Sequence, residues 1–249
     1  MTFGAFAAKS GHNIVHYTLE LSEVDVGHRY DSRISEISVD DLYDNKDFVK
    51  QKIDETVKGK IVIKSYPTKS VGVQALKNHY ATLILRGMKP EIIIVDYGDL
   101  LKSRENYEAK RLNEEAVYEE LRGWAMEINT PIWTVTQINR EGMDIEVITL
   151  KYISECIAKA FIADLFLTMN RKKDSPQPEI GNIFFAKNRL GPDGIKLPML
   201  INTAISKVQI LPPELNDDHD SDEDATYRLK EKFKNFQKKM ASKNDGTIN

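Results

Sequence analysis

The chain has 249 residues, of which 41% are hydrophobic and 29% charged, and its formal net charge is −3. These values are typical of a soluble protein with one large domain and a tail, and the net charge excludes a uniformly basic surface. No apolar run approaches the roughly 18 residues that span a bilayer, and the single cysteine, Cys156, excludes an internal disulfide. We therefore expect no membrane partner and a reducing compartment inside the cell.

The first apolar patch, residues 3–8, lacks a basic segment before it and a cleavage site after it, which predicts a packed helix rather than a signal peptide. Short β-branched runs then alternate with helical patterns. The strand candidates are residues 14–18, 60–64, 92–95 and 132–135, and the clearest helices are residues 70–86 and 109–129. In the second helix the residues at helical spacing are Leu112, Ala116, Leu121, Trp124, Ala125 and Ile128. This alternation predicts a parallel sheet covered on both faces.

The pattern changes after Phe161. Residues 165–169, 182–187 and 196–201 are strand candidates joined by short turns, one of which is Gly191 to Gly194, so we expect an antiparallel extension of the sheet. We place the end of the domain at residue 211. Residues 212–249 begin with an acidic run and continue with many lysines, which indicates a flexible tail. The alternative is a partner-docking helix that presents Leu229, Phe233, Phe236 and Met240.

Asp96 follows four apolar residues at the end of the third strand candidate. Ligands of parallel sheets bind at the carboxyl ends of the strands, and a carboxylate there can hold the Mg²⁺ that bridges nucleotide phosphates. The alternative interpretation is an aspartate that only caps the following turn.

Two more strand ends carry polar side chains. Glu20 follows the first strand candidate, where a glutamate can deprotonate an attacking water. Alternatively, it is a surface carboxylate favoured by the start of a helix. Gln137 follows the fourth strand candidate, where an amide can contact a γ-phosphate or the attacking water. Alternatively, it is only a polar residue that leaves the sheet.

Lys187 and Arg189 lie two residues apart at a strand end, so both side chains face the same side. Two cations beside a tight turn suit an anion that is presented from outside, such as the phosphates of a neighbouring subunit. A solvated basic hairpin is the alternative.

Together and in this order, the segments resemble the DnaB-like hexameric helicases, in particular the T-even phage branch. The matching segments, with the family pattern in parentheses, are 17–22 (FSLEM), 94–101 (IDYLDLL), 136–141 (SQLNRE), 163–165 (ADL) and 187–194 (KNRNGPTG). Residues 29–31 and 37–42 resemble the phage branch, and the likeness covers about residues 1–210.

The resemblance implies an α/β fold with a RecA-like P-loop NTPase core, in which a mostly parallel sheet is flanked by helices. It implies ATP-dependent unwinding of DNA or translocation on single-stranded DNA during replication, with ATP and Mg²⁺ as cofactors. A homo-hexamer is expected, with a primase or helicase loader as a further partner, in the cytoplasm of a bacterium or of a phage-infected host.

Roles follow for single residues. Glu20 would be the catalytic base, Asp96 the magnesium anchor and Gln137 the phosphate sensor, while Lys187 and Arg189 would act in trans on the nucleotide of the adjacent subunit. Two loops, residues 101–111 and 139–159, would line a channel for DNA. The candidates for phosphate contact are Lys102, Arg104, Lys110, Arg140 and Lys151.

One family motif is missing from the printed sequence, which contains no Gly-x-x-x-x-Gly-Lys-Ser/Thr segment. Residues 2–13 resemble the helix and turn that follow this loop. We therefore expect part of a split or truncated product whose upstream part carries the loop and an interior strand, and we expect two neighbouring strands with unpaired edges. The isolated chain would then neither hydrolyse ATP nor form an active hexamer.

Two other functions stay open at this point. The same core could serve a RecA-type recombination ATPase, or a regulatory or scaffold subunit that kept the fold without catalysis. The presence of all five strand-end and hairpin residues argues against the scaffold.

Overall fold

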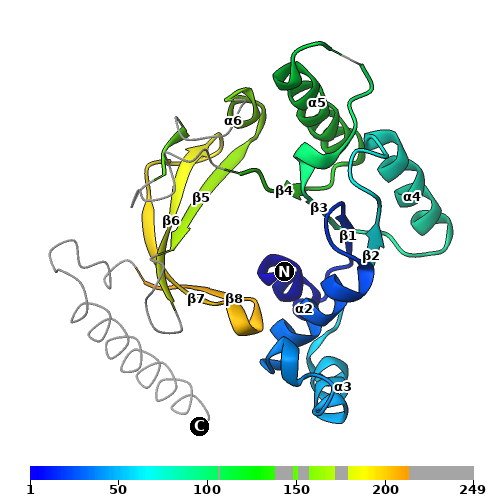
Figure 1. The fold of residues 1–249 in the computed structure, drawn as a ribbon, viewed down its shortest axis with the longest axis vertical. Helices are drawn as coiled ribbons and strands as arrows, with labels where there is room; N and C mark the ends of the chain where they lie inside the picture. Colours follow the sequence, from blue (N-terminus) through cyan, green and yellow to red (C-terminus); the bar gives the residue numbers. More distant parts are fainter. Residues whose placement is uncertain (106, 138–147, 151–156, 172–178, 213–249) are drawn as a thin grey trace, which may run out of the picture.

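The computed structural model describes residues 1–105, 107–137, 148–150, 157–171 and 179–212, which form two four-stranded sheets and the helices around them (Figure 1). The predicted DNA contacts Arg140 and Lys151, and the tail from residue 213 onward, lie outside the described residues. No helix in these ranges is both long and apolar enough to cross a bilayer.

The first sheet is entirely parallel, as predicted. Its strands are β1 (Ile14–Thr18), β2 (Ile61–Ser65), β3 (Ile92–Asp96) and β4 (Ile132–Thr134), in the order β2-β1-β3-β4. The register pairs Thr18 with Ser65 on one side and with Asp96 on the other. Because the strands run in one direction, their carboxyl ends meet at one edge of the sheet.

Two neighbouring strands with unpaired edges were predicted. Among the described residues β4 pairs only with β3 and β5 only with β6, so each of these consecutive strands ends a sheet with one edge unpaired. β3 pairs with β1 along one edge and with β4 along the other, where Ile93, Ile94 and Val95 face residues 132–134. The β3–β4 ladder is only three residues long, so contacts beyond the ladder have to hold the chain after β4.

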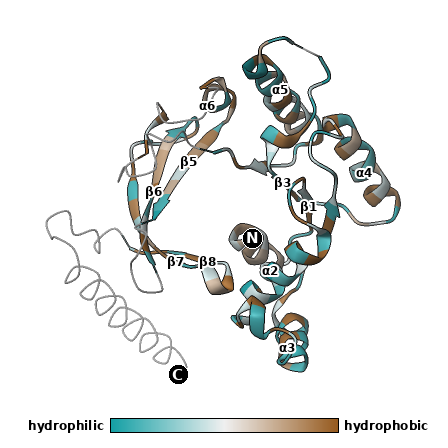
Figure 2. Cartoon of the chain, viewed as in Figure 1, coloured by the Kyte–Doolittle hydropathy of each residue, from teal (hydrophilic) through white to brown (hydrophobic). Residues whose placement is uncertain are grey.

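Helices cover both faces of the parallel sheet. One face carries α1 (Thr2–Lys9), α2 (Glu23–Ser35) and α3 (Lys46–Thr56), and the other carries α4 (Val73–Leu85) and α5 (Lys110–Ile128). Figure 2 shows apolar and polar residues on different sides of these helices, as expected when one side packs against a sheet.

The alternation of side chains along β1 decides which face each residue joins. Ile14 packs with the alanines of α1, whereas Tyr17 lies in the larger core with Leu76 of α4 and Trp124 of α5. Both sets are almost completely buried, which makes β1 the centre of the domain.

The second sheet is antiparallel, in the order β5-β6-β7-β8. Its strands are β5 (Leu165–Arg171), β6 (Glu179–Asn188), β7 (Lys196–Asn202) and β8 (Lys207–Ile210), and the short helix α6 (Ala158–Ile162) precedes them. The predicted hairpin at Gly191 to Gly194 is confirmed by the β6–β7 pairing. Within the described residues these strands form a sheet of their own rather than extra strands of the first one (Figure 1).

The segment at β8 anchors the second sheet to the helices of the first. The hydroxyl of Thr2 donates to the carbonyl of Ser206 at 3.0 Å and accepts from the backbone N–H of Val208 at 3.2 Å. Lys207 forms an ion pair with Glu36, which ends α2 in a left-handed conformation. These contacts fix the distal side of the antiparallel sheet against α1 and α2.

Candidate active site at the carboxyl edge of the parallel sheet

Asp96 ends β3 in a partly buried position. Its backbone carbonyl accepts a hydrogen bond of 2.8 Å from the N–H of Leu19, the residue before Glu20. The exit of β1 is therefore bound directly to the exit of β3. This places the residues that follow the two strands at the same edge of the sheet.

His16 of β1 lies beneath the Asp96 carboxylate. Its Nδ1 is 2.9 Å from the hydroxyl of Tyr30, and its Nε2 is 3.8 Å from Oδ2 of Asp96, beyond hydrogen-bonding distance. Burial lowers the pKa of His16, so the imidazole is neutral near pH 7. The polar contact with Nε2 of His16 lowers the pKa of Asp96, and the positive charges of the N-terminus and Arg29 add to this effect, so the carboxylate is ionised. The sequence pattern did not single out His16, because a histidine inside an apolar strand normally indicates only burial.

Tyr97, the residue after Asp96, connects Asp96 to the residues at the other two strand ends. The side-chain amide of Gln137 donates a hydrogen bond of 3.2 Å to the phenol oxygen of Tyr97. Burial raises the pKa of Tyr97, and the negative charges of Glu20, Asp99 and Asp96 add to this increase. The residues at the three strand ends thus lie at one edge of the sheet, and Gln137 contacts the phenol of Tyr97 directly. Sequence reasoning missed Tyr97, although it lies next to Asp96 in the same motif.

Glu20 has the exposure that a proton acceptor needs. Its carboxylate is exposed and makes no hydrogen bond or ion pair with other described residues. The turn that carries it is held by Thr18, whose hydroxyl accepts from the N–H of Leu21 at 3.0 Å. The backbone around Glu20 is fixed, while its side chain is available to solvent.

Lys187 and Arg189 lie on β6 and just after it, and both contact the end of α6. Lys187 donates to the carbonyls of Ala160 and Phe161 at 2.9 and 2.7 Å. Arg189 forms an ion pair with Asp164 and donates to the carbonyl of Phe161. Burial lowers the pKa of Lys187, and the charge of Arg189 adds to this effect. The predicted common face is present, and in this chain both cations have partners within their own subunit.

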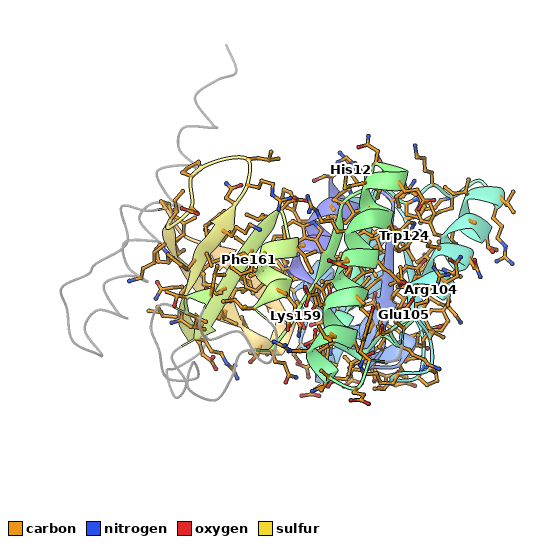
Figure 3. The ribbon with its side chains drawn as sticks, turned by 90° about the horizontal axis from the view of Figure 1, so that it is seen from above. His12, Arg104, Glu105, Trp124, Lys159 and Phe161 are labelled. Carbon is orange, nitrogen blue, oxygen red and sulfur yellow. The ribbon has the colours of Figure 1, made fainter. Side chains whose placement is uncertain are left out.

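The described DNA-contact candidates lie at the start of α5 and in the segment before it. Lys102 and Arg104 are exposed and line a hollow of about 820 Å³ between α4 and α5, and Figure 3 labels Arg104 there. Lys110 is exposed, and its Nζ lies 3.7 Å from Oε1 of Glu114. By contrast Lys159, the last residue of the second predicted channel loop, is buried, so this end of that loop lies inside the protein.

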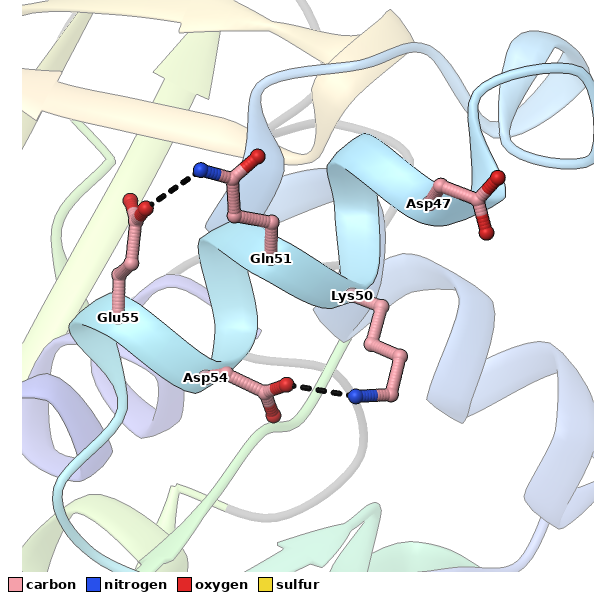
Figure 4. A pocket seen from close by; sticks show the side chains of 5 residues that line it. All are labelled: Asp47, Lys50, Gln51, Asp54 and Glu55. Atoms are coloured by element: carbon pink, nitrogen blue, oxygen red, sulfur yellow. Dashed lines mark hydrogen bonds and ion pairs between the residues drawn. The ribbon is translucent and has the colours of Figure 1, made fainter.

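The acidic outer face of α3 forms a shallow depression that offers no comparable chemistry (Figure 4). Its charged and amide side chains pair along the helix, Lys50 with Asp54 at 2.8 Å and Gln51 with Glu55 at 2.7 Å. Across the described ranges, no group of three or more histidine, cysteine or acidic residues has the arrangement of a metal site.

Comparison with known proteins identifies the family of the chain. Residues 2–207 match the family described as DnaB-like helicase C terminal domain. The DnaB-like replicative helicase of Enterobacteria phage T4 is 27% identical over 192 residues, which cover 73% of this chain and 40% of that protein. The chain therefore spans less than half the length of this relative.

Two solved structures share the fold. One, described as an ATPase domain, matches with a TM-score of 0.69 at 15% identity, over 84% of this chain and 80% of that one. A DnaB-like replicative helicase, solved in a study of its interactions with primase, matches with a TM-score of 0.70 at 15% identity, over 84% of this chain and 56% of that one. The fold is thus that of the RecA-like ATPase domains of helicases.

Proposed function

Because this chain belongs to the DnaB-like helicase C-terminal domain family, we propose that it is the motor part of a replicative helicase. In this role it couples ATP hydrolysis to translocation on single-stranded DNA and to unwinding of the duplex ahead. The observation that carries the proposal is the convergence of Glu20, Asp96 and Gln137 at one edge of the parallel sheet, where Gln137 contacts Tyr97.

The chemistry divides among these side chains. The exposed carboxylate of Glu20 orients the attacking water and accepts its proton. Gln137 contacts the terminal phosphate or the water from the end of β4, and its hydrogen bond to Tyr97 fixes where the amide lies. Because the exits of β1, β3 and β4 are joined by backbone and side-chain contacts, the catalytic groups are positioned before substrate binds.

Asp96 fits the magnesium ion that accompanies ATP. Proteins hold Mg²⁺ in nucleotide sites with one or two carboxylates, together with phosphate oxygens and waters. Asp96 offers one such carboxylate, ionised by its environment and placed at the ligand-binding edge of the sheet. The ion, when bound, neutralises charge on the transferred phosphoryl group. The phosphate-binding loop that would complete the site is not among the described residues.

A ring of subunits gives Lys187 and Arg189 their role. We assign both to the nucleotide of the adjacent subunit, where an arginine supplied in trans stabilises charge in the transition state. The side chain of Arg189 is 38% exposed, and its carboxylate partner, Asp164, also pairs with Arg122. Phosphate oxygens from a neighbouring subunit therefore have to displace only one exposed carboxylate from Arg189. This arrangement supports a homo-hexamer in which each site is completed by its neighbour.

DNA binding and further partners follow from the same proposal. Lys102 and Arg104 provide exposed cations on the segment after η2 (Gly98–Leu100), and cations of this kind follow a phosphate backbone with little sequence preference. We propose a primase or helicase loader as a further partner, and the cytoplasm of a bacterium or phage-infected host as the location.

A comparison of two activities in the full-length protein tests this function. We expect ATP-dependent unwinding of a forked duplex, which decreases as salt rises because phosphate contacts are screened. Strand exchange between homologous DNA molecules without unwinding would instead indicate a recombination ATPase. Binding of DNA without any nucleotide-dependent activity would indicate a scaffold.

A further inference from the structure

Lys159 of α6 is a buried lysine at the centre of a polar cluster. Its side chain is 1% exposed, and Figure 3 shows it beside α5. Its Nζ lies 2.9 Å from Oδ2 of Asp99 and 3.3 Å from the hydroxyl of Thr136, and it forms an ion pair with Glu114 of α5. Oxygen atoms of three side chains thus surround the ammonium.

The cost of burial indicates that this lysine does more than fill space. Removing an ammonium from water is unfavourable unless it is paired, and apolar residues of similar volume commonly stabilise a protein equally well or better. Glu114 is 3% exposed, so the pair lies in the interior with little water to screen it. A cluster of this kind is therefore better explained by the geometry that it imposes.

Asp99 is the residue that the lysine holds in place. It lies in η2, three residues after Asp96, and accepts hydrogen bonds from Tyr118 at 2.7 Å and from Thr136 at 2.9 Å. Thr136 immediately precedes Gln137. Asp99 consequently links the chain that leaves β3 to the chain that leaves β4.

Few other contacts hold the exit of β4. Its ladder with β3 ends at Thr134, whose hydroxyl accepts from the N–H of Gly98 at 2.8 Å. Beyond that point, the carbonyl of Val135 accepts from Tyr118 at 3.2 Å, and Thr136 contacts Asp99 and Lys159. The position of Gln137 therefore depends on the cluster centred on Lys159.

We propose that Lys159 is a positioning residue for the strand-end site. Its ammonium fixes Asp99, Asp99 fixes Thr136, and this keeps Gln137 in hydrogen-bonding contact with Tyr97, the residue after Asp96. The inference rests on the proposed function for its catalytic consequence, but its structural part is independent of nucleotide. α6 also provides the carbonyls of Ala160 and Phe161 that bind Lys187, so the same short helix positions both sets of residues.

Amide hydrogen exchange tests the structural part without nucleotide. In Lys159→Met, we expect exchange in residues 97–101 and 134–137 to accelerate by roughly tenfold or more, while β1 and β2 keep their protection. Lys77→Met is the matched control, because Lys77 forms an ion pair of 2.7 Å with Glu127 between α4 and α5, away from the strand ends. Unchanged exchange at the strand ends, or the same increase throughout the sheet, overturns the proposal.

A double variant separates positioning from stability. Lys159→Met with Glu114→Leu replaces the buried ion pair by two apolar side chains, which should restore the unfolding temperature. We expect kcat for ATP hydrolysis by the full-length protein to stay reduced by roughly tenfold, with KM nearly unchanged. Recovery of both kcat and the unfolding temperature would show that Lys159 only stabilises the fold and does not position the site. If the unsubstituted protein hydrolyses no ATP, the proposed function fails, and the exchange comparison still decides the role of Lys159.

Discussion

The amide of Gln137 donates a hydrogen bond of 3.2 Å to the phenol oxygen of Tyr97, which joins the end of β4 to the residue after Asp96. Through this contact, a residue proposed to detect phosphate is bound to the strand that carries the proposed metal anchor. A shift of one strand end therefore changes the position of the other. This relationship suggests a direct test.

Replacing Tyr97 with phenylalanine removes the acceptor and keeps the ring. Because a single hydrogen bond contributes about 1 kcal/mol, we expect kcat for ATP hydrolysis to fall by roughly three- to tenfold with little change in KM. Steady-state kinetics of the full-length protein provide the measurement, and Tyr43→Phe is the control because Tyr43 is 84% exposed. Equal kinetics for the two variants would show that the phenol does not position Gln137.

Asp96→Asn tests the metal anchor. The substitution keeps the shape but removes the charge, so the Mg²⁺ concentration for half-maximal hydrolysis should rise by about tenfold or more, and kcat should fall. A magnesium titration of the full-length protein measures both. Asp47→Asn on the exposed face of α3 is the matched control. An unchanged magnesium requirement in Asp96→Asn would contradict the assignment.

The ion pair between Glu36 and Lys207 joins α2 to β8, and its contribution should depend on pH. Lys207 lowers the pKa of Glu36 in the folded state, so the stabilisation is present above the pKa of the unfolded state and is lost as pH falls through the folded value. Because Glu36 is 52% exposed, we expect Glu36→Gln to lower the free energy of unfolding by at most about 1 kcal/mol near neutral pH. The difference from the unsubstituted chain should shrink as pH falls and should vanish once acid protonates Glu36 in the folded state as well. A difference that stays equal over this pH range would exclude this electrostatic origin.

Substitution by alanine should have opposite effects on stability at two glycines that lie in helices. A Cβ added at Gly4 of α1 would lie 2.3 Å from the hydroxyl of Tyr30, the group that contacts His16. Gly4→Ala should therefore destabilise the fold by about 1–3 kcal/mol. A Cβ at Gly123 of α5 meets nothing within 4 Å, so Gly123→Ala should stabilise the helix by about 0.5–1 kcal/mol. Thermal unfolding of both variants measures the two signs, and destabilisation by Gly123→Ala would contradict the described packing of α5.

The strands and the two clearest helices could be predicted because their local patterns agree with their final environment. Continuous apolar runs such as Ile92 to Val95 form strands buried on both faces. α2 and α3 were missed, because their sequences are polar and present only a few apolar residues, such as Val26, Tyr30 and Ile34, to the sheet. The support for these helices comes from residues distant in sequence, which no local pattern shows.

The buried face of α5 shows the same limit. The predicted apolar stripe included Leu112, which is 38% exposed, and omitted Glu114 and Tyr118, which are buried. Glu114 turns inward because Lys159 provides a counter-charge from a segment more than forty residues away. A charged residue on the buried side of a helix cannot be predicted before its partner is known.

The candidate site was predictable to a similar degree. Glu20, Asp96 and Gln137 could be found because ligand-binding residues of a parallel sheet follow its strands directly. Tyr97, His16 and Lys159 act through contacts that only the tertiary structure creates. The strand order β2-β1-β3-β4 was not predicted, since strand order is not contained in the pattern of any single strand.

The central claim is that the edge around Asp96 is the ATPase site of a helicase motor, and Glu20→Gln tests it most directly. DNA-stimulated ATP hydrolysis by the full-length protein should fall by about a hundredfold or more, because the substitution removes the proton acceptor and keeps the size of the side chain. Binding of a fluorescent ATP analogue, measured in parallel, should remain within a few-fold of the unsubstituted protein. Hydrolysis at the unsubstituted rate in Glu20→Gln would contradict the account.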